Sequence, residues 1–214
     1  MTRRVRKPSK TIIEWPDLHC EDRANLFVTN YLSLPIGDGS PHEVNAVIEI
    51  PRGTTNKYEY DKQLNVFRLD RNLHSPVHYP GDYGFIPGTL AEDNDPLDVL
   101  VTADEATFTG CMLEVRPVGL LAMVDDQGPD TKILSVPDRN PRYDQIHTID
   151  QIFPHVLTEI EHFFTIYKEL EGKKTRMEGW HGPREARQAI LESRKRYLEA
   201  REEAGREQPA TTSS

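Results

Sequence analysis

The sequence predicts an α+β fold, mainly β, in which strands come first and helices follow. Between residues 44 and 136, short segments alternate apolar and polar residues and end at proline or glycine, a pattern typical of strands. From residue 154 the apolar residues recur at the three- and four-residue spacing of a helix. Strands before helices favour a small barrel or sheet that carries helices on one side.

The strand candidates occupy the middle of the chain. Each is a short alternating segment, and they are Val44–Ile50, Lys57–Asp61, Leu64–Leu69, Leu97–Ala103, Met112–Val124 and Lys132–Val136. Pro51 ends the first of them, and the second and third flank a polar turn and predict a hairpin. Pro117 and Gly119 interrupt the long fifth segment. We interpret Tyr79–Gly84 as a turn because it contains a Pro-Gly pair.

Two helices are predicted in the last third of the chain. In 154–171, Ile160, Phe163 and Tyr167 fall on one helical face, with Pro154 in the first turn and Gly172 after the end. A second, charge-rich helix is predicted from Pro183 to about residue 203. The polar residues beyond about 205 are expected to be disordered.

Composition limits the class of protein. The 214 residues are 36% hydrophobic, with a mean hydropathy of −0.63 and a net charge of −9. We expect one domain, with polar extensions at both ends. The acidic balance disfavours a nucleic-acid binder, and the absence of a long apolar run predicts no membrane span. The basic first ten residues are interpreted as a solvated tail rather than a secretory signal.

Cysteine usage bears on the compartment. Cys20 and Cys111 are the two cysteines of the chain, too few for a disulfide framework. We therefore expect a cytoplasmic protein.

An acidic motif carries the strongest chemical signal. Asp93, Asp95 and Asp98 lie within six residues beside an apolar segment, and carboxylates this close repel one another unless something offsets their charge. A calcium-binding EF-hand loop would need glycine at its sixth position and glutamate at its twelfth, where this chain has aspartates. A phosphatase with a nucleophilic aspartate would have an apolar strand before the motif, which this chain lacks. The remaining interpretation is a site for hard cations, Mg²⁺ or Mn²⁺.

A second acidic cluster comprises Asp125, Asp126 and Asp130, followed by Lys132. Alone it is typical of an ordinary turn between strands. Facing the first motif, it would form a second wall of a site for several metal ions.

Cations and phenols are spread around these motifs. The cations are Lys57, Arg71 and Lys168, and the phenols are Tyr79, Tyr83 and Tyr167. The carboxylate Glu59 shares one strand face with Lys57. Taken singly, Lys57 and Arg71 are as readily interpreted as solvated charges, and Tyr167 as a core residue on the apolar stripe.

Together these segments resemble the soluble inorganic pyrophosphatases of family I. The matching segments are Val47–Pro51, Lys57–Glu59, Asp70-Arg71, Tyr79–Gly84, Asp93–Val99, Arg116–Gly119, Asp125–Lys132, His162–Lys168 and Met177–Trp180. The resemblance covers about residues 40–180 of a single domain spanning 1–214, with extensions at about 1–35 and 183–214. It implies a small closed OB-type β-barrel with helices packed outside.

The resemblance also implies roles for individual residues. Asp93, Asp98 and Asp130 would hold a first metal, Asp98 would bridge to a second, and Asp125 with Asp130 would hold a metal that enters with the substrate. Asp95 would accept the proton of the attacking water, and Glu49 would act through metal-bound water. Lys57, Arg71, Lys132, Tyr167 and Lys168 would bind the two phosphates near Tyr83, with Glu59 and Tyr79 as supports. The role of Asp126 stays open.

The implied activity is hydrolysis of pyrophosphate to two orthophosphates with several Mg²⁺ per site, for which Mn²⁺ is a possible substitute. A homo-oligomer is expected, with a hexamer favoured, and no nucleic-acid or membrane partner. One rival is hydrolysis of organic phosphates such as nucleoside triphosphates on the same metals. The other is a non-catalytic OB-type module, which would favour a basic, aromatic-rich face.

Overall fold

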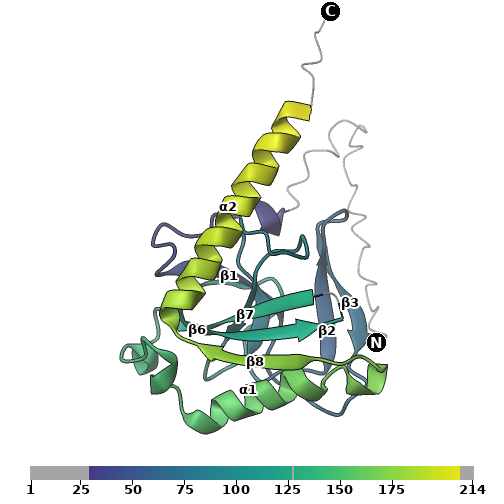
Figure 1. Cartoon of the computed structure of the whole chain (residues 1–214), viewed down its shortest axis with the longest axis vertical. Helices are drawn as coiled ribbons and strands as arrows, with labels where there is room; N and C mark the ends of the chain where they lie inside the picture. Colours follow the sequence, from purple (N-terminus) through teal and green to yellow (C-terminus); the bar gives the residue numbers. More distant parts are fainter. Residues whose placement is uncertain (1–28, 127, 208–214) are drawn as a thin grey trace, which may run out of the picture.

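The computed structural model describes residues 29–126 and 128–207 (Figure 1). Its strands, its two α-helices and the 3-10 turn that follows α1 are, in chain order, β1 (Val44–Ile50), β2 (Asn56–Asp61), β3 (Val66–Asn72), β4 (Asp82–Phe85), β5 (Asp98–Val101), β6 (Met112–Asp125), β7 (Gly128–Pro137), α1 (Pro154–Ile166), the 3-10 turn (Glu169–Glu171), β8 (Arg176–His181) and α2 (Pro183–Glu207). No helix in these ranges is long and apolar enough to cross a membrane. Cys20 and the basic first ten residues lie outside the described ranges.

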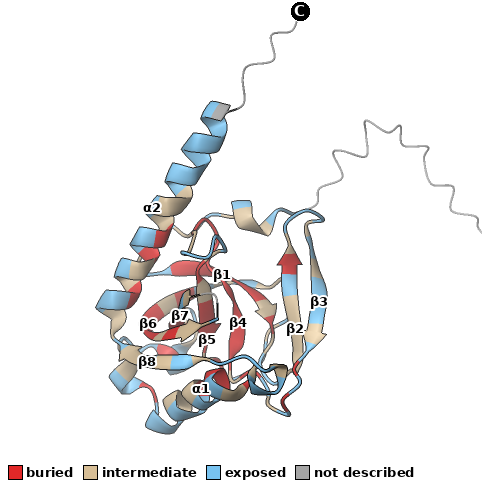
Figure 2. Cartoon of the chain, turned by 45° about the vertical axis from the view of Figure 1, so that its right-hand side comes forward, coloured by how far each residue is buried: buried red, intermediate tan, exposed pale blue. Residues whose placement is uncertain are grey.

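Five strands close on themselves into a ring. The main sheet runs β1-β4-β5-β7-β6-β8, and β1 also pairs with β6, so that β1, β4, β5, β7 and β6 form a complete circuit. Of these neighbours, β5 and β7 run parallel, and the other pairs are antiparallel. The hairpin β2–β3 forms a separate two-stranded sheet beside the ring (Figures 1 and 2). The predicted α+β, mainly β fold class is confirmed.

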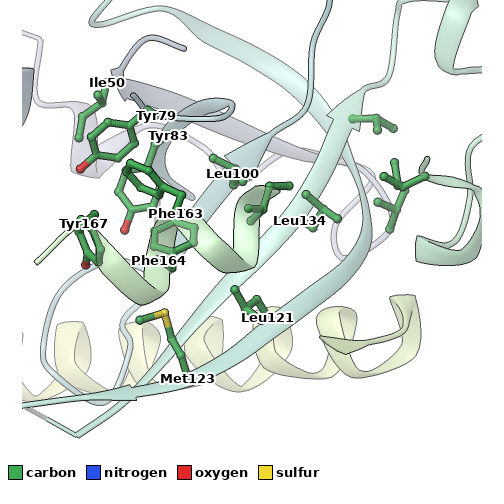
Figure 3. Packing of buried hydrophobic residues seen from close by; sticks show 14 of the residues in the cluster. Ile50, Tyr79, Tyr83, Leu100, Leu121, Met123, Leu134, Phe163, Phe164 and Tyr167 are labelled. Atoms are coloured by element: carbon green, nitrogen blue, oxygen red, sulfur yellow. The ribbon is translucent and has the colours of Figure 1, made fainter. Parts of the chain in front are cut away.

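The helix α1 covers one part of the core with aromatic side chains. Ile160, Phe163 and Phe164 are buried on its predicted apolar stripe, and Tyr167 follows directly after it. The Phe163 ring lies 4.8 Å from the ring of Tyr79 and 5.2 Å from that of Tyr167, centroid to centroid. Figure 3 shows these rings packed together with Tyr83. Burying such large side chains supplies much of the hydrophobic stabilisation of a small fold.

The second helix, α2, packs on a different part of the ring. Ala186, Ile190 and Ser193 are buried at helical spacing, and the first two join the cluster formed by Val44, Ile48 and neighbouring strand residues. The distal part of α2 projects beyond the body of the molecule and is exposed (Figure 2).

Several details of the sequence prediction were wrong. Strand β7 begins at Gly128 rather than Lys132, so Asp130 lies in a strand and not in a turn. Tyr79–Gly81 bends as expected, but Asp82–Phe85 continues as strand β4 rather than as part of a turn, and the strand β8 was not predicted. The first helix ends at Ile166, before a 3-10 turn that Gly172 closes with a φ of +75°. The second helix continues to Glu207 instead of ending in disorder near residue 205.

Candidate active site

Two pockets contain most of the predicted site residues. The larger, of about 550 Å³, lies between the β2–β3 hairpin and the ring, and we call it the hairpin pocket. Its lining includes Glu49, Lys57, Glu59, Tyr83, Asp95 and Asp98. The smaller, of about 230 Å³, we call the acidic pocket, and it is lined by Glu92, Asp93, Asp125, Pro129 and Asp130. Carboxylates from distant parts of the chain therefore line both pockets, with Asp98 at the hairpin pocket and Asp93 and Asp130 at the acidic pocket.

Lys132 contacts one carboxylate of each pocket. Because β5 and β7 are parallel, Asp98 lies directly opposite Lys132, and Asp130 lies two residues away on the same side of β7. The Lys132 ammonium donates to Asp98 and, at 2.6 Å, to Oδ1 of Asp130. Burial opposes the charge of Lys132, but Asp98 and Asp130 outweigh it and raise the lysine pKa. The ammonium is thus a fixed positive charge between the pockets.

Tyr83 holds Asp98 from the other side. It lies on β4, the antiparallel neighbour of β5, and its hydroxyl donates to Oδ2 of Asp98 at 2.5 Å. Burial raises the pKa values of Tyr83, Tyr79 and Tyr167. All three phenols therefore stay protonated near neutral pH, and Tyr83 is a neutral hydrogen-bond donor to Asp98.

A β-bulge places Glu49. Ile48 pairs with Gly84 and Ile50 pairs with Tyr83, so Glu49 is the extra residue that interrupts the register between β1 and β4. Such a bulge redirects a side chain out of the regular alternation. The backbone N–H of Tyr60 donates to Oε1 of Glu49 at 2.8 Å. Burial nevertheless raises the pKa of Glu49 to about 8.

Asp93 and Asp95 lie on the loop between β4 and β5. The backbone N–H of Asp95 donates to Oδ1 of Asp93 at 2.9 Å, which fixes the spacing of the two residues. The Asp95 side chain is exposed at the hairpin pocket. Lys62, in the β2–β3 turn, reaches across and donates to Oδ1 of Asp95 at 2.5 Å.

Two predicted phosphate-binding cations face each other on the hairpin. Lys57 of β2 pairs with Arg71 of β3, and both contact Asp70, at 3.7 Å in the case of Lys57. Lys57 also forms an ion pair with Glu59. Arg71 Nε donates to Oε1 of Glu171 at 3.0 Å, and this carboxylate is almost buried. Arg71 is thereby tied to the segment that follows α1.

The end of α1 supplies the remaining pair. Lys168 donates to Oδ2 of Asp125 at 2.9 Å, and its ammonium lies 5.2 Å from the centre of the Tyr167 ring. Lys168 therefore reaches a carboxylate of the acidic pocket, whereas Tyr167 lies in the buried aromatic cluster. Asp126 instead pairs with Lys173 at 3.7 Å, where both side chains are exposed.

Lys62 and Glu171 were missed by the sequence analysis. Lys62 follows a predicted strand and is typical of a polar turn, and Glu171 fell within the predicted first helix. Their contacts with Asp95 and Arg71 join residues that are 33 and 100 positions apart. No local pattern marks such contacts, which depend on how the hairpin packs against the ring.

The donor set of the pockets fits hard divalent cations. The pocket carboxylates come from Asp and Glu, whose oxygens suit Mg²⁺ or Mn²⁺ better than softer metals. Within the described ranges, no group of three acidic, His or Cys side chains is arranged to ligate one ion, since lysines hold Asp98, Asp125 and Asp130. Burial raises the pKa values of Glu49 and Asp130, so added positive charge would favour their ionised forms.

Comparison with known proteins gives a consistent result. The family model described as inorganic pyrophosphatase matches residues 46–198. An inorganic pyrophosphatase of Methanosarcina acetivorans is 52% identical over 163 residues, which cover 76% of this chain and 97% of that protein. One from Geobacillus stearothermophilus is 47% identical over 156 residues, covering 73% and 94%. The crystal structure of the Thermus thermophilus inorganic pyrophosphatase superposes with a TM-score of 0.78 at 46% identity, covering 79% of this chain and 99% of that one.

The strand ring and its likeness to solved inorganic pyrophosphatases define a hydrolase with an OB-type fold, of a family that depends on divalent metal ions. More specifically, the chain belongs to the inorganic pyrophosphatase family.

Proposed function

We propose that this chain hydrolyses inorganic pyrophosphate to two orthophosphates, using Mg²⁺ ions at the hairpin and acidic pockets. The observation that carries this proposal is that Lys132 forms ion pairs with Asp98, which lines the hairpin pocket, and with Asp130, which lines the acidic pocket. Pyrophosphate carries several negative charges, so its site needs both metal ions and fixed cations. Membership of the pyrophosphatase family agrees with this chemistry.

In this proposal, different carboxylates bind different metal ions. Asp93, Asp98 and Asp130 would hold a first ion, Asp98 would also contribute to a second, and Asp125 with Asp130 would hold an ion that enters with the substrate. Glu49 acts through a water molecule. Ions bound there supply charge neutralisation at the phosphates and lower the pKa of water. Several Mg²⁺ ions are proposed, with Mn²⁺ as a possible substitute.

Asp95 is proposed as the general base. Its side chain lines the hairpin pocket and is exposed enough to meet a water molecule there. An ionised carboxylate at this place can accept the proton of the water as its oxygen attacks phosphorus. Lys62 donates to Oδ1 of this carboxylate and holds its position beside the pocket.

The cations and phenols are proposed to bind phosphate oxygens. Arg71 presents a planar fork of donors, and Lys132 and Lys168 act as point charges. Lys57 joins them from the hairpin, and Tyr167 donates a neutral hydroxyl, with Tyr83 nearby. Glu59 and Tyr79 support this arrangement through their contacts with Lys57 and with the aromatic core.

We further propose a cytoplasmic homo-oligomer, with a hexamer favoured. The free thiol of Cys111 suits a reducing compartment.

Phosphate release from pyrophosphate, measured with excess Mg²⁺ and again with a chelator, tests the proposed function. We expect rapid release that the chelator abolishes and added Mg²⁺ restores. A panel that includes nucleoside triphosphates at the same Mg²⁺ concentration serves as the control. Faster cleavage of a triphosphate than of pyrophosphate, or release that persists without divalent ions, would contradict the proposal.

A further inference from the structure

The helix α2 contacts the loop that carries Asp93 and Asp95. Arg194 Nη1 donates to the carbonyl of Gly88 at 2.8 Å, and Arg196 Nε donates to that of Leu90 at 2.9 Å. In the reverse direction, the Leu90 N–H donates to the carbonyl of Ser193 at 2.9 Å. Three hydrogen bonds therefore join one turn of the helix to the first part of the loop. We call Ser193, Arg194 and Arg196 the helix clamp.

The helix clamp is fixed by its own neighbours. Arg196 also donates to Oγ of Ser193, which is buried, and the Arg194 guanidinium lies 5.3 Å from the centre of the Tyr197 ring. At Gly88, a Cβ atom would lie 2.5 Å from Arg194 Nη1, and φ is +68°. Glycine therefore permits both the left-handed backbone and the close approach of the guanidinium.

The loop transmits this anchoring to the acidic residues. The Ala91 N–H, adjacent to Leu90, donates to the carbonyl of Asp95 at 2.7 Å. The Asp95 N–H in turn donates to the Asp93 carboxylate. A small cavity of about 110 Å³ is lined by Asp93, Asp130 and Arg196 together, so the clamp also borders the acidic side chains.

We propose that Arg194 and Arg196 are positioning residues for the divalent-metal site. They act by holding Gly88–Leu90, which keeps Asp93 and Asp95 in place before any ion binds. Without the clamp, the loop would become ordered only when the metal binds. The free-energy cost of ordering it would then weaken metal binding. This inference rests on the proposed function, because it assigns Asp93 to the metal site.

The substitution Arg196→Met tests the proposal because it keeps an unbranched side chain and removes the donors. We expect the Mg²⁺ concentration for half-maximal rate to rise about tenfold, which corresponds to about 1.4 kcal/mol. The kcat at saturating Mg²⁺ should change less than threefold, because a bound ion would itself hold Asp93 and, through the Asp95 N–H bond to Asp93, the rest of the loop. Lys195→Met is the matched control, because Lys195 lies between the two arginines but is exposed and paired with Glu199.

Two further readouts do not depend on turnover. Mn²⁺ binding measured by electron paramagnetic resonance, without substrate, should weaken by a similar factor in Arg196→Met and not in Lys195→Met. Amide hydrogen exchange of the metal-free protein should speed up at residues 88–97 and stay unchanged in β5. If Arg196→Met does not fold, Arg194→Met and Arg196→Gln provide the same comparison, and Arg196→Gln, which retains one amide donor, should lose less metal affinity.

The outcomes separate the two proposals. Absence of phosphate release by the unmodified chain would refute the proposed function, whereas Mn²⁺ binding and hydrogen exchange would still report on the clamp. Unchanged Mn²⁺ affinity and loop exchange in Arg196→Met, with or without a lower melting temperature, would make the arginine purely structural and overturn the inference.

Discussion

Asp98 is the side chain at which the elements of the site meet. Its Oδ2 atom accepts from the Tyr83 hydroxyl on β4 and from the Lys132 ammonium on β7, while Asp98 itself lies on β5. Hydrogen bonds to a charged group are stronger than neutral ones, and this group is held by three adjacent strands. The central carboxylate therefore has little freedom, in contrast to Asp95 on its exposed loop.

Replacement of Asp95 tests the proposed general base. Asp95→Asn retains the shape of the side chain but removes its ability to accept a proton. We expect kcat to fall by about two orders of magnitude or more, with Mg²⁺ binding largely retained. Steady-state kinetics and a metal titration measure the two effects. Asn94→Gly, in the same loop at a φ of +68° that suits glycine, is the control. A near-normal kcat in Asp95→Asn would remove Asp95 from this role.

Arg71 should not tolerate lysine. The change Arg71→Lys retains one positive charge but loses the planar fork and the donor that now bonds Glu171. We expect the KM for pyrophosphate to rise about tenfold. Arg68→Lys, an exposed arginine on the same strand, should leave KM unchanged. Equal KM values in the two variants would place Arg71 outside the substrate contacts.

Among the elements, those with clear alternation or helical spacing were predicted best. Strand β1 has the predicted bounds, because its apolar residues alternate up to Pro51. Strand β4 was obscured by the bend at Tyr79–Gly81, and its four residues, Asp-Tyr-Gly-Phe, are few and include an aspartate and a glycine, which are depleted in strands. Strand β8 is a polar strand at the end of the main sheet, where pairing with β6 decides its conformation.

In the candidate site, too, local sequence patterns predicted some features, and features that depend on tertiary contacts were missed. Asp93, Asp95 and Asp98 are neighbours in the sequence, so their clustering could be read directly. Lys168, just after α1, contacts Asp125 at the end of β6. The family resemblance placed both residues in the site, but this contact was not predicted. Lys62 and Glu171 had neither signal, because tertiary packing alone brings them to Asp95 and Arg71.

Gly84 is the residue on which the pairing of β1 and β4 depends most. A Cβ atom there would lie 1.9 Å from the carbonyl oxygen of Val47, a backbone atom that cannot move aside. We expect Gly84→Ala to lower the free energy of unfolding by about 3 kcal/mol, as severe overpacking does. Urea denaturation measures this loss. Gly182→Ala, where the neighbouring atom is 3.5 Å away on a side chain, is the control, and equal stabilities would contradict the prediction.

At the scale of the whole molecule, the ring of strands carries the pockets, and α1 and α2 brace them from different sides. The family match over residues 46–198 includes the helix clamp. The organisation as one domain over 1–214, with a core at about 40–180 and extensions at about 1–35 and 183–214, stays a prediction.

Oligomer formation is also a prediction at this scale. Large apolar side chains such as Leu64, Phe108 and Phe153 are more than 60% exposed, which favours burial against other copies of the chain. Size-exclusion chromatography with light scattering should give six times the 24.5 kDa chain mass. A shortened chain containing residues 29–207 should give the same stoichiometry. A monomer at micromolar concentration would refute the prediction.

The parallel pairing of β5 with β7 limits how this enzyme can be redesigned. Asp98 and Lys132 meet only because their strands run side by side in one register. Deleting a single residue upstream within either strand would turn one of the two partners to the opposite face. Laboratory evolution of this scaffold should therefore proceed by exchanging side chains at fixed strand length, with insertions and deletions confined to the connecting turns.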